Sequence, residues 1–231
     1  MFLSVFNNLS EKDKSNAVEN LIENSTPSKD FFLMIILSIL MATFGLLINS
    51  SAVIIGSMLI APMLYPVLSL ALGITLSDPK LIYRSFYTVI KSLVFGISGA
   101  AIIAVFFSNN EYDITNEIVA RIQPSLAYAG IAVIAGLAAS FAVVKPKISD
   151  SFPGIAISVA LIPPLAVTGI GIARFDWGII SGSFVLFLIN IAGIVFSSMI
   201  VFSLMNLYLK RKVAETTIAK EDMNLKIENK K

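Results

Sequence analysis

The sequence contains no cysteine and no histidine. Disulfides and thiolate nucleophiles are therefore excluded, and the usual metal ligand and the usual proton shuttle at neutral pH are missing. Charged residues are also scarce, at 14% of the 231 positions against 56% hydrophobic. A soluble domain of this length would lack the polar residues to cover its surface. These shortages predict an integral membrane protein without a metal or a cofactor.

Long apolar runs take up most of the chain. A helix needs roughly 20 residues to cross a hydrocarbon core of ~30 Å, and six runs reach about this length. They extend from Phe31 to Asn49, Ser51 to Ser77, Tyr83 to Phe107, Leu126 to Val144, Phe152 to Ala173, and Trp177 to Leu209. We predict an all-α fold, a polytopic membrane protein with six transmembrane helices in the lipid bilayer.

The basic residues lie beside the apolar runs, and their distribution predicts the orientation. With six crossings, one side holds Lys12, Lys14, Lys29, Lys80, Arg84, Lys145, Lys147, Lys210, Arg211 and Lys212. The other side holds Arg121 and Arg174. This asymmetry predicts a multi-pass protein of the plasma membrane with both termini in the cytoplasm. A net charge of +2 without a basic stripe argues against a nucleic-acid partner.

Prolines stand at the centre of the second and fifth runs, Pro62 in SMLIAPMLYP and Pro163 in SVALIPPLAV. A proline removes a helical hydrogen bond, and a carbonyl left unpaired in hydrocarbon costs several kcal/mol. A shift of 101 residues lays Ile54, Ser57, Pro62 and Leu64 on Ile155, Ser158, Pro163 and Leu165. Three crossings per half is an odd number. We therefore predict a 3+3 inverted repeat with proline-broken second and fifth helices.

The repeat divides the chain into five segments. These are a cytoplasmic N-terminal segment 1–30, a first three-helix repeat 31–107, an external acidic loop 108–125, a second three-helix repeat 126–209 and a charged cytoplasmic tail 210–231. The external loop is expected to be a solvated connector, with a short surface helix as the alternative.

Broken helices bring helix ends of opposite partial charge to the membrane midplane, where they can bind a small ion or a neutral solute. The prolines are expected to free the carbonyls of Met58, Pro62, Val159 and Ala160. The predicted binding site consists of Ser57, Met58, Pro62, Tyr65, Pro66, Ser158, Val159, Ala160, Pro163, Pro164, Thr168, Asn49 and Asn190. None of these residues carries a charge, which disfavours a carboxylate proton relay.

Two features of the third run, Tyr83 to Phe107, have their own interpretation. Lys91 lies about two turns inside it and either reaches back to the cytoplasmic interface or lines a pathway. A face of small residues allows close helix packing and is a candidate surface for a homo-oligomer. This face consists of Ser92, Gly96, Ala100 and Ala104.

The stretch NSSAVIIGSMLIAPMLYPVLSLALGITLSDPKLIYRS resembles the signature of the domain of unknown function 389 family. The Ser-Ala-x-x-x-Gly-x-Met-Leu-x-Ala-Pro pattern from Ser51 to Pro62 carries the resemblance, which covers roughly residues 31 to 205. The family comprises prokaryotic membrane proteins without an agreed activity. The resemblance therefore implies an architecture and little about function.

Two functions fit the pattern. The first is a channel or transporter that uses the two broken helices as its site, and the second is a scaffold or sensor subunit without transport. An enzyme is not expected. A serine protease of the Ser-His type would lack its base, an aspartyl type would lack its pair of carboxylates inside the membrane, and only a Ser-Lys arrangement with Lys91 would remain.

Overall fold

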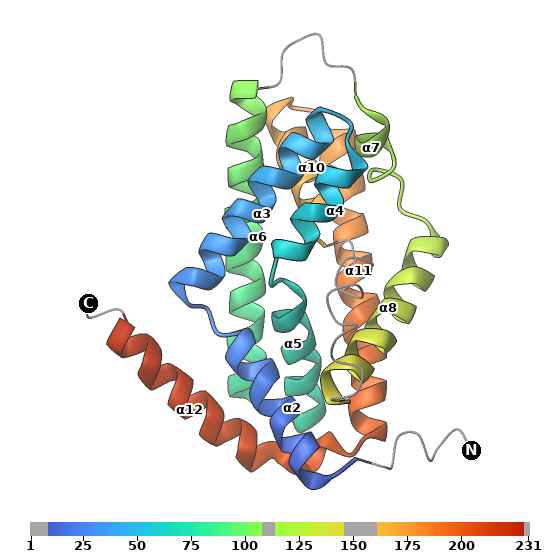
Figure 1. Ribbon diagram of the computed structural model, residues 1–231. Coiled ribbons are helices and arrows are strands. Elements are labelled where there is room, and N and C mark those ends of the chain that lie inside the picture. Colours follow the sequence, from blue (N-terminus) through green and yellow to red (C-terminus); the bar gives the residue numbers. More distant parts are fainter. Residues whose placement is uncertain (1–8, 108–113, 146–160, 229–231) are drawn as a thin grey trace.

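The computed structural model describes residues 9–107, 114–145 and 161–228, and all its regular elements within these ranges are helices (Figure 1). The first half of the chain contains α2 (Glu11–Asn24), α3 (Lys29–Leu47), α4 (Ser51–Ile60), α5 (Leu64–Leu76) and α6 (Pro79–Phe107). The second half contains α7 (Asn116–Val119), α8 (Leu126–Val144), α10 (Ile162–Ala173), α11 (Trp177–Leu204), the 3-10 helix η2 (Leu207–Lys210) and α12 (Arg211–Glu228).

Four of the described helices, α3, α6, α8 and α11, are long and apolar enough to cross a membrane. The pair α4 and α5 makes a fifth if it counts as one span, and α10 is apolar but shorter, at 12 residues. Large apolar side chains such as Phe106 and Ile134 remain exposed on these helices, as lipid-facing residues do. The predicted all-helical membrane fold is confirmed at this level. The sixth predicted span is too long, because α11 ends at Leu204 and Asn206 has a positive φ.

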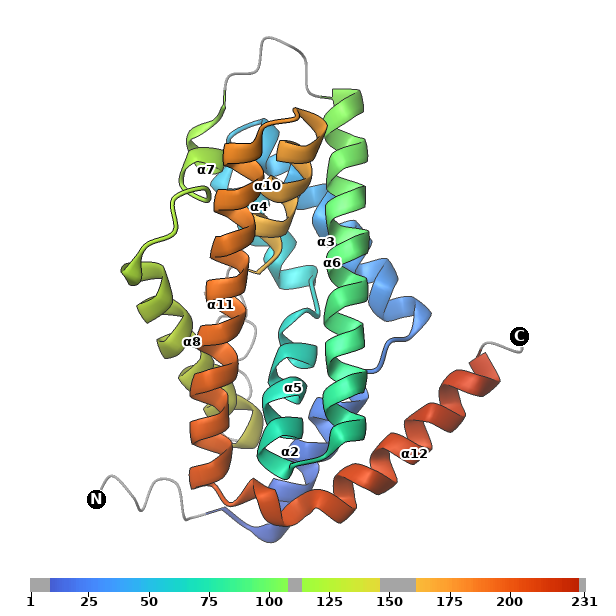
Figure 2. The same ribbon diagram turned by 180° about the vertical axis from the view of Figure 1, so that it is seen from behind.

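Two long helices, α6 and α11, frame the molecule and run in opposite directions (Figure 1). The shorter α5 and α10 lie between them, one toward each end of the bundle (Figure 2). Each of these two short helices packs against both long ones. We call the end at which α2 and α12 lie the base, and the opposite end the top.

Three turns between consecutive apolar helices have the same construction. In each, a residue with positive φ ends the helix, and the N–H of the next residue donates to a glycine carbonyl five positions back. The three sets are Gly45, Asn49 and Ser50; Gly73, Ser77 and Asp78; and Gly171, Phe175 and Asp176. A Cβ on each glycine would lie 3.0 Å from the backbone nitrogen of the isoleucine nine positions later. Glycine therefore allows the next helix to pack closely.

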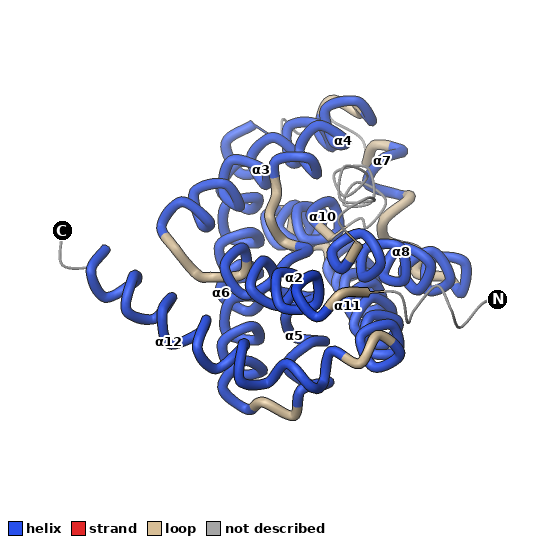
Figure 3. Tube along the Cα trace, turned by 60° about the horizontal axis from the view of Figure 1, so that its bottom comes forward, coloured by secondary structure: helices blue, strands red, loops and turns tan. Residues whose placement is uncertain are grey.

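The predicted polar end segments form packed helices at the base (Figure 3). Val18, Leu21 and Ile22 of α2 are fully buried, and α2 packs against α5 and α8. The Asp222 carboxylate of α12 pairs with Lys80 at 2.8 Å and with Arg84 at 3.0 Å. Both segments are therefore parts of the folded structure, and α12 is fixed to the base of α6.

Candidate functional site

The chain breaks between α4 and α5 at Ala61, Pro62 and Met63, and the two helices are bent by 52°. Pro62 has no N–H to continue the ladder of α4, and Ala61 takes the extended conformation that a residue before proline prefers. After the break α5 continues toward the base, where α6 begins (Figure 1). The predicted break at Pro62 is confirmed.

Two carbonyls at this break accept hydrogen bonds. The Ser38 hydroxyl of α3 donates to the carbonyl of Ser57 at 2.6 Å, and both side chains are fully buried. The expectation that the Pro62 carbonyl stays unpaired is wrong, because the N–H of Tyr65 donates to it at 3.3 Å. The role of Ser38 was missed, although an isolated serine in the run from Phe31 to Asn49 was a signal.

Other carbonyls at the break are without donors. Within the described part of the chain, no protein N–H or O–H is found to donate to the carbonyls of Met58, Leu59 and Ile60. The hydroxyl of Ser57 donates to the Ile54 carbonyl at 2.6 Å and is therefore occupied. The last turn of α4 thus presents acceptors.

The prolines of the second predicted break, Pro163 and Pro164, lie in the first turn of α10. Four residues on, the Thr168 hydroxyl bonds to the Pro164 carbonyl at 2.8 Å and lies 2.9 Å from the hydroxyl of Ser183 in α11. Thr168 and Ser183 are buried. Three predicted site residues, Ser158, Val159 and Ala160, lie outside the described residues.

Close contacts set the register of the hairpin formed by α5 and α6. Gly73 of α5 lies against Ile82 of α6. Because these helices are antiparallel, Met63, ten residues before Gly73, lies level with Ser92, ten residues after Ile82. Ser92 is therefore level with the first break.

The hairpin formed by α10 and α11 has the same register. Gly171 of α10 lies against Ile180 of α11. Leu161, ten residues before Gly171, therefore lies level with Asn190, ten residues after Ile180. A third contact, Gly169 against Ala100, independently places Leu161 level with Ser92. Ser92 and Asn190 thus lie level with Met63 at the first break and with Leu161 at the start of α10.

The small-residue face of α6 has a different role from the one proposed for an oligomer. Ser92, Ala100 and Ala104 are buried within the chain. A Cβ on Gly96 would lie 3.1 Å from Ile39 of α3, and Gly169 of α10 packs directly on Ala100. This face is therefore a contact surface for α3 and α10 and is not free to bind a second subunit.

The remaining predicted residues lie in different parts of the bundle. Pro66 is buried and Tyr65 half-buried in the first turn of α5. Asn49 lies away from the breaks at the top, where its side chain accepts from the N–H of Glu117 at 3.1 Å. Lys91 directs its ammonium group to the Phe32 ring, 4.3 Å from the centroid, in the first turn of α3.

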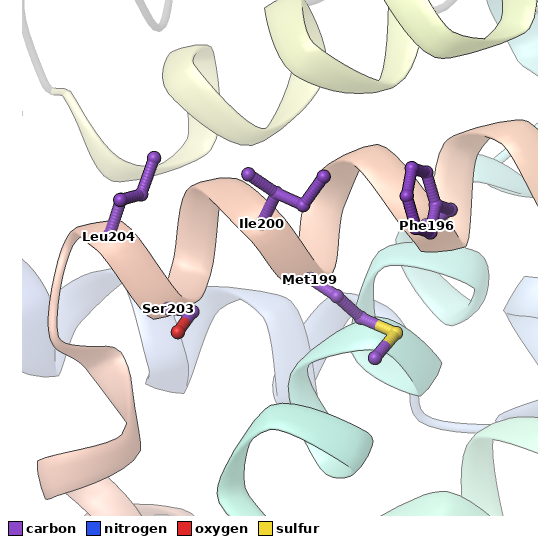
Figure 4. Close-up of a pocket in the computed structure, with 5 residues that line it drawn as sticks. All are labelled: Phe196, Met199, Ile200, Ser203 and Leu204. Atoms are coloured by element: carbon purple, nitrogen blue, oxygen red, sulfur yellow. The ribbon is translucent and has the colours of Figure 1, made fainter.

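The arrangement has neither a cluster of carboxylates nor a metal-ligand set. No group of three or more His, Cys, Asp or Glu residues lies together in the described part of the chain. A separate shallow groove along α11 is lined by Phe196, Met199, Ile200, Ser203 and Leu204. Figure 4 shows Phe196, Ile200 and Leu204 in a row along one side of the helix. These apolar side chains fit a lipid-facing surface, so we place the candidate site at the breaks.

The fold and the breaks define a polytopic helical membrane protein, and comparison with known proteins identifies its family. The family described as domain of unknown function 389 matches residues 58–196. An uncharacterised protein of Methanocaldococcus jannaschii is 38% identical over 179 residues, which cover 76% of this chain and 54% of the relative. The chain belongs to the domain of unknown function 389 family, and it spans about half the length of this relative. No solved structure matches.

Proposed function

We propose that the chain is a channel or transporter for a small ion or neutral solute in the plasma membrane. Its two proline breaks would enclose a midplane site, and its six crossings would form a 3+3 inverted repeat. The observation that carries the proposal is that polar groups from α4, α6 and α11 lie at one level of an otherwise apolar bundle. Buried polar groups and broken helices at membrane depth are costly, and they mark binding sites in transporter folds.

Matching positions support the inverted repeat. The turn that ends in Asp78 and the turn that ends in Asp176 are offset by 98 residues, and so are Met63 and Leu161; this offset is three residues shorter than the shift of 101 that lays Pro62 on Pro163. Ser92 and Asn190 have the same offset. The two long helices that contain them run in opposite directions (Figure 2). Equivalent helices of opposite direction are what an inverted repeat requires.

The test is a flux assay with purified protein in liposomes, in which Na⁺, K⁺, Cl⁻ and small neutral solutes are screened separately. We expect flux of one solute class, and we expect a Pro62→Ala, Pro163→Ala double variant to change its rate. The control variant is Pro27→Ala, since Pro27 lies in the loop between α2 and α3 at the base. Absence of flux for every solute by a folded protein would favour the scaffold or sensor function instead.

A further inference from the structure

The first turns of α5 and α10 are poor in hydrogen-bond donors. Pro62 and Pro66 belong to the first break and Pro163 and Pro164 to the second, and proline has no N–H. The N–H of Tyr65 is already bonded to the Pro62 carbonyl. Helix N-termini bind anions through free N–H groups in their first turn. These first turns have lost several of those groups, so the breaks are unsuited to an anion.

The first break is rich in acceptors. The carbonyls of Met58, Leu59 and Ile60 are without donors among the described residues. They form the C-terminal end of α4, which carries partial negative charge. The oxygens of this turn therefore favour a positively charged or donating ligand.

A side chain on the neighbouring helix supports this ligand class independently. The Ser92 hydroxyl is fully buried and has no hydrogen-bond partner in the described structure. A buried hydroxyl without a partner is costly, and a bound ligand would satisfy it. Ser85 and Ser198 also have unpartnered hydroxyls, but each lies roughly 10 Å along its helix from the level of the breaks. Of these three hydroxyls, that of Ser92 therefore lies level with the first break.

We infer that the site binds a monovalent alkali cation through carbonyl oxygens of the last turn of α4 and the Oγ of Ser92. That the cation site is used in transport rests on the proposed function. Carbonyl and hydroxyl oxygens are the ligands that replace the water of such ions, whereas sites for Ca²⁺ and Mg²⁺ use carboxylates. Lys91, the neighbour of Ser92, directs its charge to the Phe32 ring.

The test measures binding separately from transport. Thermal unfolding of the purified protein in detergent is followed while Na⁺ or K⁺ replaces N-methylglucamine as the chloride salt at constant ionic strength. In a second series chloride replaces gluconate with N-methylglucamine as the cation. A ligand that binds the folded state raises the unfolding temperature in a saturable manner. We expect saturation with one alkali cation and no response to the anion.

The matched pair of variants is Ser92→Ala and Ser98→Ala. Ser98 lies on the same helix, but it is exposed and its hydroxyl bonds to the Val94 carbonyl at 2.7 Å. Loss of one oxygen ligand to a charged group should weaken the apparent cation affinity of Ser92→Ala about tenfold or more. Ser98→Ala should leave it unchanged. The unpartnered state of the Ser92 hydroxyl predicts that Ser92→Ala folds normally in cation-free buffer.

The outcomes separate the two proposals. A saturable response to chloride alone, or to neither series, would overturn the cation site, while the flux assay still decides transport. Saturable cation binding that depends on Ser92 but is accompanied by no flux would support the cation site and overturn transport. Equal affinities in the two serine variants would exclude Ser92 as a ligand.

Discussion

The hydrogen bond from Ser38 to the Ser57 carbonyl stabilises the first break, and its removal is a quantitative test of how the break is held. The bond is 2.6 Å long and both side chains are fully buried. A buried carbonyl left without its donor costs about 1–3 kcal/mol, whereas polar contacts between membrane helices average ~0.6 kcal/mol. For Ser38→Ala we therefore expect a loss of about 1–2 kcal/mol in the free energy of unfolding.

The assay is reversible unfolding of the purified protein from detergent micelles by sodium dodecyl sulfate, followed by circular dichroism. Ser98→Ala serves as the control, because it makes the same substitution at an exposed position where the hydroxyl bonds within its own helix. We expect the control to change stability by less than about 0.5 kcal/mol. If Ser38→Ala costs no more than the control, the Ser57 carbonyl does not depend on Ser38 and the reasoning fails.

Three further predictions concern packing, the C-terminal helix and pH. Gly169→Ala should destabilise by about 1–3 kcal/mol in the same assay, since its Cβ would lie 2.5 Å from a side chain of α6, whereas Gly130→Ala meets nothing within 4 Å and should not. Asp222→Asn removes the ion pairs that join α12 to Lys80 and Arg84 of α6 and should speed proteolysis of α12; an unchanged cleavage rate would show that these pairs do not hold α12 to α6. Hydrogen bonds, chiefly from Lys210, lower the pKa of Glu11 from 4.5 to about 2. A lowered folded-state pKa stabilises above the unfolded pKa, so this contact should weaken as pH falls from 4.5 toward 2, measured by hydrogen exchange of α2.

The features that could be predicted from the sequence are those with a local cause. Pro62 breaks its helix wherever it lies, because the missing N–H is a property of the residue. Asp78 and Asp176 lie between consecutive apolar runs, and both cap the next helix by accepting from its N–H groups. The length of the apolar runs also located the four long helices, because this length depends on composition within one segment.

Features that depend on tertiary contacts could not be predicted. The small-residue face of α6 indicated close packing, but the pattern does not tell which helices cover it, and these proved to be α3 and α10 of the same chain. Similarly, Ser38 and Ser57 belong to different helices, and neither sequence position reveals the other as its partner. The burial of α2 had a signal in the helical spacing of Val18, Leu21 and Ile22, which the polar composition of residues 1–30 obscured.

The central claim is that solvent or solute reaches the level of the breaks inside the membrane. Because the chain has no cysteine, a Ser92→Cys variant carries a single thiol, and Ala104→Cys on the same buried face of α6 is its control. The measurement is labelling of each thiol by a small, membrane-impermeant thiosulfonate cation in liposomes. The account predicts that Cys at position 92 is labelled, while Cys at position 104 is not labelled. Equal lack of labelling at both positions would contradict it.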